Sequence, residues 1–257
     1  MLMPQRRRRN PLLLWELPRA ALELASIPLA TPALITVPWG DNHPVLVIPG
    51  FLGHDDHTRC LRGFLKSRGY QVHGWELGRN MGLHRVGGLD TLLARLDDIY
   101  QANNQTRVSI VGWSLGGVFA RRLARARPEQ VRQTISLGSP IGRINDPETY
   151  TQTVYERIGD EVVPKQVIGQ YLMENLQPCS VPATAIYSRS DAIVSHHIAK
   201  EPESDITENL EVISSHVGLV VNPQVFYLVG RKLAHPENNW RKLRPLWDRC
   251  SKFDESL

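Results

Sequence analysis

From residue 44 to about residue 234, short apolar runs alternate with stretches that have helical periodicity. The apolar runs are continuous rather than alternating, which is typical of parallel strands covered on both faces. The expected strands are residues 44–50, 71–77, 106–113, 131–140, 181–191 and 209–213, and the clearest expected helices are 57–70, 87–103, 115–127 and 222–234. Such alternation favours right-handed crossovers between parallel strands. We therefore predict an α/β fold, with a mostly parallel central sheet and helices on both faces.

One interval interrupts this alternation and defines the expected domain organisation. Residues 141–180 are too long for a simple connection and contain amphipathic stretches, which predicts a short helical cap insertion. The insertion belongs to a single predicted domain over residues 34–235. Residues 1–33 form an N-terminal amphipathic helical segment in this interpretation, and residues 236–257 form a polar C-terminal tail.

The charge of the chain does not indicate a nucleic-acid partner. Its formal net charge is +4, and the consecutive arginines Arg6, Arg7, Arg8 and Arg9 account for it. The remainder is close to neutral and lacks a basic motif interleaved with aromatic residues. We therefore expect no nucleic-acid binding.

The cysteines indicate in which cellular compartment the protein is expected. Cys60, Cys179 and Cys250 are odd in number and have no metal-type spacing. A reduced, cytoplasmic compartment is the simplest interpretation, and a single disulfide is the alternative.

The N-terminal stretch "RRRRNPLLLWELPRAALELASIPLA" superficially resembles a signal peptide. Its apolar run ends after five residues, at Glu16, which is too short for a signal peptide or a membrane span. An amphipathic helix fits better, and its expected apolar face consists of Leu17, Ala21, Leu24 and Ala25. Two interpretations stay open. The helix packs on the domain's own surface, or residues 6–28 contact a membrane peripherally, with the arginines facing anionic lipid and residues 12–15 entering the interface.

The sequence "GWSLG" places Ser114 between Gly112 and Gly116, at the junction of an expected strand and an expected helix. Glycines on either side relieve the crowding of a sharp turn, and the serine is held in a strained conformation with its oxygen above the sheet. This context predicts a nucleophile at Ser114. A serine needs a general base and an orienting acid to act as a nucleophile at neutral pH.

The chain supplies an acid and a base in the order that this turn requires. Asp191 follows the expected strand 181–191 within "AIYSRSDAIV", and His216 follows the next strand within "EVISSHVGLV". Four other residues compete for the roles of acid and base, but none of them directly follows an expected strand. They are Asp205, His196, His197 and His235. We interpret "HDDH" at 54–57 as a helix start capped by Asp55 or Asp56, rather than as a metal site.

Two backbone N–H groups are expected to form an oxyanion hole. One is that of Leu115, directly after the expected nucleophile. The other is that of Phe51 in "VIPGFLG", where Gly50 allows the turn to approach closely.

Four segments together resemble the lipase and esterase branch of the α/β-hydrolases: "VLVIPGFLG", "GWSLGG", "YSRSDAIV" and "SSHVGL". The segment "GWELGRNMG" is similar to a loop of bacterial, especially actinobacterial, members. The resemblance covers about residues 40–235. It implies a catalytic triad and oxyanion hole made of Ser114, Asp191, His216, Phe51 and Leu115. Pro49-Gly50 stands where many lipases have His-Gly, which changes the shape of the loop rather than its donor.

The expected activity is cleavage of carboxylic esters through an acyl-enzyme on Ser114, without metal or cofactor. An apolar ester or lipid suits the expected pocket residues Leu52 and Trp113, with Arg79 near a polar head group. An acyltransferase with the same triad is the alternative chemistry. A catalytically silent, membrane-associated binding protein is the alternative from another class. Serine at the turn disfavours a dehalogenase, which uses an aspartate there.

Overall fold

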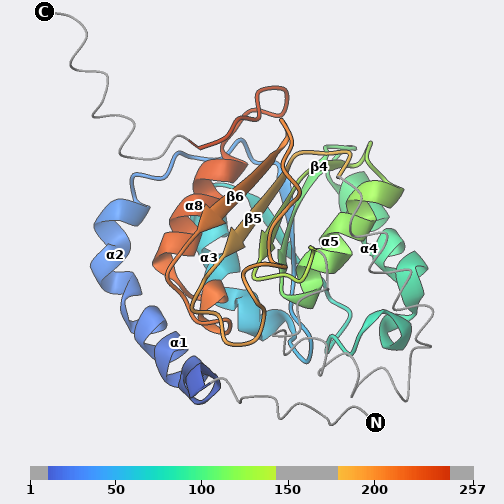
Figure 1. The fold of residues 1–257 in the computed structure, drawn as a ribbon. Coiled ribbons are helices and arrows are strands. Elements are labelled where there is room, and N and C mark those ends of the chain that lie inside the picture. Colours follow the sequence, from blue (N-terminus) through green and yellow to red (C-terminus); the bar gives the residue numbers. More distant parts are fainter. Residues whose placement is uncertain (1–10, 143–178, 244–257) are drawn as a thin grey trace, which may run out of the picture.

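The computed structural model describes residues 11–142 and 179–243, and its centre is a six-stranded parallel sheet (Figure 1). The strand order is β2-β1-β3-β4-β5-β6. The strands are β1 (Pro44–Ile48), β2 (Gln71–Gly74), β3 (Val108–Trp113), β4 (Val131–Leu137), β5 (Ala183–Tyr187) and β6 (Thr207–Glu211). The predicted parallel sheet with helices on both faces is confirmed, and each predicted strand overlaps an observed one.

Side chains on successive residues of the central strands point to opposite faces of the sheet. Leu46 and Ile110 contribute to a core cluster beneath α4 (Gly88–Ala102) and α5 (Leu115–Ala126). Their neighbours Val45 and Val111 contribute to a second cluster with residues of α3 (Arg59–Ser67) and α8 (Pro223–Leu233). Figure 1 shows these two helix pairs on the two sides of the sheet. In the described residues there are also four 3-10 helices, namely η1 (Pro11–Trp15), η2 (Asp55–Thr58), η3 (Leu83–Val86) and η4 (Gly218–Val220).

Two of the expected segments fall wholly or partly outside the described residues. The predicted cap insertion, residues 141–180, lies almost entirely there, as does most of the predicted tail, 236–257. Among the described residues, none of the helices combines the length and apolar character needed to cross a bilayer.

Residues 11–39, here called the N-terminal arm, form η1, α1 (Glu16–Ala25) and α2 (Ile27–Leu34), which run along the outside of the domain (Figure 1). The arm packs on its own domain, but the apolar face of α1 that the sequence indicates is not the face that packs inward. Leu17 is 70% exposed and Leu24 is 45% exposed, whereas Glu16 is only 3% exposed. The polar face packs inward because backbone N–H groups of the adjoining loops donate hydrogen bonds to the carboxylates of Glu16 and Glu23.

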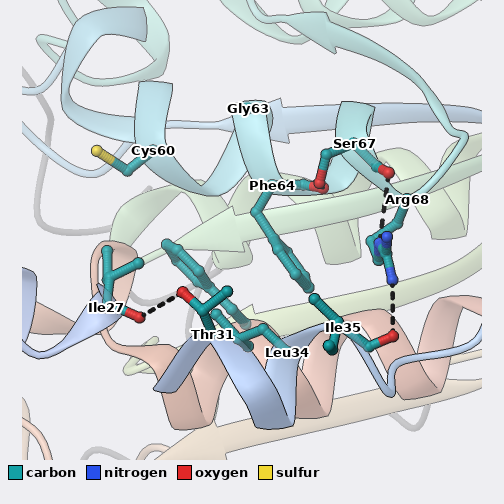
Figure 2. Close-up of a pocket in the computed structure, with 10 residues that line it drawn as sticks. Ile27, Thr31, Leu34, Ile35, Cys60, Gly63, Phe64, Ser67 and Arg68 are labelled. Atoms are coloured by element: carbon teal, nitrogen blue, oxygen red, sulfur yellow. Dashed lines mark hydrogen bonds between the residues drawn. The ribbon is translucent and has the colours of Figure 1, made fainter. Parts of the chain in front are cut away.

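The second helix of the arm is attached to the domain by apolar contacts and by one arginine. Leu34 of α2 is buried against the cluster that contains α3 and α8. Arg68 at the end of α3 donates to the carbonyls of Ile35 and Val37, at 3.2 and 3.1 Å. A groove of about 450 Å³ lies between α2 and α3. Figure 2 shows Phe64 among the residues that line it. The arm is therefore part of the folded domain.

A polar cluster, buried except at Asp41, lies at the edge of the sheet where the strands begin. His43, just before β1, lies between the carboxylate of Asp41 and the hydroxyl of Ser109, with His43 Nε2 2.8 Å from Ser109 Oγ. Arg132 donates to Asp41 at 2.8 Å. The order of groups resembles a catalytic triad, but Ser109 and His43 are buried at the opposite edge from Ser114, so this cluster is structural.

We expect this cluster to make stability depend on pH. Burial lowers the pKa of His43, although the hydrogen bond with Asp41 opposes the shift. As pH falls below about 6.5, His43 takes up a proton more readily in the unfolded chain than in the folded one, so stability is lost. The free energy of unfolding should fall more steeply in the wild type than in His43→Gln, by up to about 1.4 kcal/mol per pH unit. Urea unfolding between pH 7 and 5 measures this difference, and equal slopes in both proteins would contradict it.

Candidate active site

Ser114 occupies a sharp turn between β3 and α5. Its backbone has φ 53° and ψ −120°, a strained conformation for a residue with a side chain. The Ser114 N–H donates to the carbonyl of Leu137 on β4, at 2.8 Å, which fastens the turn to the next strand. A Cβ on Gly112 would lie 2.3 Å from the carbonyl oxygen of Gly116, and one on Gly116 would lie 2.3 Å from that of Ile48. Both glycines are therefore required by packing.

Asp191 and His216 form a buried hydrogen-bonded pair on the loops that follow β5 and β6. His216 Nδ1 lies 2.7 Å from Asp191 Oδ2. The other carboxylate oxygen of Asp191 accepts the backbone N–H groups of Ile193 and Val194, both at 2.8 Å. Three donors thus surround this carboxylate, which fixes its orientation toward the imidazole.

The same edge of the sheet carries Ser114 and the Asp191–His216 pair. Trp113, the residue before Ser114, donates its indole N–H to the backbone carbonyl of His216, at 3.0 Å. Gly138, which follows the Leu137 carbonyl that binds Ser114, lies directly against the pair. A Cβ on Gly138 would be 3.0 Å from Asp191 Oδ2 and 3.3 Å from His216 Nδ1. Trp113, which precedes Ser114, and Gly138, at the end of the neighbouring strand, therefore both contact the acid–base pair.

Two opposing effects act on the imidazole of His216. Burial by itself lowers the pKa of His216, while the charge and hydrogen bond of Asp191 raise it, and the net result is a raised pKa. The nearby charge of Glu16 acts in the same direction as Asp191. The imidazolium form is thus stabilised inside the protein, which is what a general base needs when it accepts a proton.

The loop after β1 closes over the turn at Ser114. A Cβ on Gly50 would lie 3.1 Å from Ser114 Cβ, so the backbone of this loop approaches the serine closely. Phe51 is half-buried, and Leu52 has a positive φ of 60°. Leu115 is the first residue of α5, and N–H groups in a first helical turn have no acceptor within the helix. These positions suit the two expected oxyanion donors.

Sequence reasoning missed Asn80, which holds that loop in place. Asn80 is fully buried. Its side-chain amide donates to the carbonyl of Pro49 at 2.8 Å, its N–H to that of Gly53 at 2.8 Å, and its carbonyl accepts from Leu52 at 2.7 Å. The available signal was its position in "GWELGRNMG", after an expected strand that lies beside β1.

The remaining predicted pocket residues differ in exposure. Trp113 is 8% exposed and lies within the core cluster beneath the site. Leu52 is 48% exposed, and Arg79 is also exposed. Leu52 and Arg79 are therefore accessible to a ligand, whereas Trp113 mainly supports His216.

The proposed helix cap within "HDDH" is wrong. His54, not Asp55 or Asp56, is the capping residue of η2. Asp55 instead accepts the backbone N–H groups of Trp75 and Glu76, both at 3.0 Å, because the end of β2 lies next to it.

A sequence model of the alpha/beta hydrolase fold matches residues 43–159. The region includes β1, the loop after it and the turn at Ser114. A triacylglycerol lipase of Burkholderia plantarii is 27% identical over 128 residues, which are 47% of this chain. The match spans only 35% of the length of that lipase.

Solved structures with the same arrangement of elements include lipases. A lipase B of Aspergillus fumigatus has a TM-score of 0.57 and 18% identity, and the match covers 78% of this chain and 54% of that one. A structure reported for the metagenome-derived lipolytic enzymes LipS and LipT has a TM-score of 0.53 and 19% identity, with 71% and 89% covered. At such identities the likeness concerns the fold. Together with the parallel sheet and its flanking helices, these matches show that the chain has the α/β-hydrolase fold.

Proposed function

We propose that the chain is a serine hydrolase that cleaves carboxylic esters through an acyl-enzyme on Ser114. The observation that carries this proposal is the buried Asp191–His216 hydrogen bond at the edge of the sheet where the strained turn presents Ser114. The similarity to lipolytic enzymes supports it at the level of the fold. The further placement in an actinobacterial branch, suggested by "GWELGRNMG", stays a prediction.

The reaction has two acyl-transfer steps. His216 takes the proton of Ser114 as the serine oxygen attacks the ester carbonyl, and Asp191 stabilises the resulting imidazolium. His216 then protonates the departing alcohol, which leaves the acyl group on Ser114. Water attacks this acyl-enzyme by the same route and releases the acid. The proposed chemistry uses no metal and no cofactor.

The negative oxygen formed in each step lies against backbone donors in this mechanism. The N–H of Leu115 comes from the first turn of α5, whose positive dipole end adds to the attraction. The N–H of Phe51 comes from the loop that Asn80 fixes. Because Leu52 is apolar and exposed beside this loop, the proposed substrate is an apolar ester or lipid, with Arg79 available to a polar head group.

The N-terminal arm carries a second part of the proposal, peripheral contact with a membrane. In the described part of the chain, ten of the thirteen exposed large apolar side chains lie between residues 12 and 39, so exposed apolar surface is concentrated on the arm. Leu14 and Leu29 are each 85% exposed. The sequence places Arg6, Arg7, Arg8 and Arg9 directly before this surface. Apolar residues beside a basic cluster are the pattern that binds an anionic bilayer.

Replacing Ser114 with alanine tests the nucleophile. We expect kcat/KM for a short-chain p-nitrophenyl ester to fall at least about a thousandfold, since no acyl-enzyme forms. A fluorophosphonate probe should label the wild type and not Ser114→Ala, while circular dichroism stays the same. Ser67→Ala, at an exposed serine in α3, is the matched control and should keep full activity. Retained turnover in Ser114→Ala, or a wild type that the probe does not label, would reject the proposal. An acyltransferase would instead yield mainly transesterified product when an alcohol is added.

The raised pKa of His216 predicts the pH dependence of the reaction. Only the neutral imidazole accepts a proton, so kcat/KM for an uncharged ester should rise with pH, with a midpoint above about 6.5. In Asp191→Asn the midpoint should move to lower pH, because burial then acts without the opposing charge, and kcat should fall about ten-thousandfold. Asp205→Asn, at an exposed aspartate in a loop, should change neither quantity. If Asp205→Asn instead lowered the midpoint and kcat while Asp191→Asn changed neither, Asp205 would be the acid.

Vesicle sedimentation tests the membrane contact. Replacing Leu14, Leu22 and Leu29 together with glutamine should weaken binding to anionic vesicles at least about tenfold, because apolar surface no longer enters the interface. Ile206→Gln, outside the arm, is the control and should bind as the wild type does. Binding to anionic vesicles should weaken with salt. This part of the proposal would be overturned if the triple variant bound vesicles as well as the wild type does. It would also be overturned if sedimentation equilibrium showed a wild-type dimer that the triple substitution dissociates, since the arm would then be a dimer interface.

A further inference from the structure

Helix α1 points a row of charged side chains at the two loops that carry the acid and the base. Glu16, Arg19 and Glu23 are spaced three and four residues apart, which places them on one face of the helix. The acid loop is defined here as residues 188–194, which include Asp191, and the base loop as residues 212–218, which include His216. Both loops pack against this face of α1.

Glu16 joins the two loops through a single carboxylate. Its Oε1 accepts the backbone N–H of Ala192 at 3.0 Å, and its Oε2 accepts that of Val217 at 3.1 Å. Ala192 directly follows Asp191, and Val217 directly follows His216. The two oxygens of one rigid, planar group therefore fix the backbone positions next to the acid and next to the base relative to each other.

The other two charged residues hold α1 in the position that this bridge requires. Glu23 accepts the N–H of Ser215 at 2.7 Å and its hydroxyl at 2.9 Å. Arg19 donates to the carbonyl and the hydroxyl of Ser190, both at 2.7 Å. A Cβ on Gly218 would lie 2.1 Å from Glu23 Oε2, so the helix packs closely on the base loop. Each loop is thus bound at more than one point.

The burial of Glu16 argues that the bridge has a specific role. A carboxylate that is 3% exposed has lost most of its hydration, which costs stability unless hydrogen bonds replace it. Leucines packed on the domain would attach a helix without that cost, yet α1 exposes Leu17 and Leu22 to solvent. The polar contact lies where it adds to the direct hydrogen bonds between the two loops and connects the residues next to Asp191 and His216.

We propose that Glu16 is a positioning residue for the acid–base pair: by bridging the N–H groups of Ala192 and Val217, it holds Asp191 and His216 in hydrogen-bonding register. This inference rests on the proposed function for its effect on turnover. Its structural part concerns the Asp191–His216 hydrogen bond itself, which can be measured without a substrate.

The variant Glu16→Gln tests the bridge, because glutamine has the same size but only one oxygen to accept an N–H. We expect kcat per active site, counted by fluorophosphonate titration, to fall about tenfold to a hundredfold, with KM little changed. Glu208→Gln is the control. Glu208 is also a buried carboxylate that accepts a backbone N–H, from Leu243 at 2.6 Å, but it lies near the start of β6, away from the site. This control should lower Tm without lowering kcat per active site.

A second measurement separates this inference from the proposed function. The low-field proton resonance of His216 Nδ1–H in the NMR spectrum reports the bond to Asp191 directly. It should shift or exchange faster with water in Glu16→Gln and stay unchanged in Glu208→Gln. A wild type without esterase activity or labelling would reject the proposed function, and the resonance would still decide the role of Glu16. An unchanged resonance in Glu16→Gln, or an unchanged kcat per active site in an active protein, would overturn it. Should Glu16→Gln fail to fold, Glu16→Asp, one methylene shorter, takes its place with the same expectations.

Discussion

The hydrogen bond between His216 Nδ1 and Asp191 Oδ2 joins two loops that leave adjacent parallel strands. Strand register aligns the ends of β5 and β6, but the acid and the base lie several residues beyond those ends. Contacts between the loops therefore have to supply the alignment. Ser188 provides one of them, since its hydroxyl donates to the carbonyl of Ser214 at 2.8 Å and accepts the Ser214 N–H at 3.2 Å. The carboxylate of Glu16 provides another from outside both loops.

Beneath this pair and around Ser114, the site depends on glycines whose neighbours lie too close to leave room for a side chain. Gly138 has a positive φ of 54° and faces both Asp191 and His216, so any larger residue there would displace the pair or Leu219. Gly112 and Gly116 play the same part on either side of Ser114. The strained serine can then be held above the sheet because its neighbours are packed too closely to relax.

The turn at Ser114 was predictable because its signal is local: a buried strand, three glycines and a helix follow one another in the sequence. The acid and the base were predictable in position because the carboxyl ends of parallel strands share one edge of the sheet. Helical periodicity in α1 identified two faces but not which one packs inward. That choice depends on N–H groups of Ala192 and Val217, which are distant in the sequence. Asn80 was missed for a similar reason, because its partners lie on the loop of another strand.

The orientation of α1 connects the two proposed roles of the arm. Its charged face binds the acid and base loops, so the face with Leu17 and Leu22 is directed away from the domain, on the side of the site. A bilayer that receives these leucines would therefore lie near the edge of the sheet that carries Ser114, where an apolar ester would enter. Hydrogen bonds from residues near both ends of α1 fasten it to both loops. Truncating the arm would remove the hydrogen bonds to the acid and base loops together with the exposed apolar surface. Substitutions confined to the outer face of the arm change the apolar surface alone and therefore isolate the membrane contact.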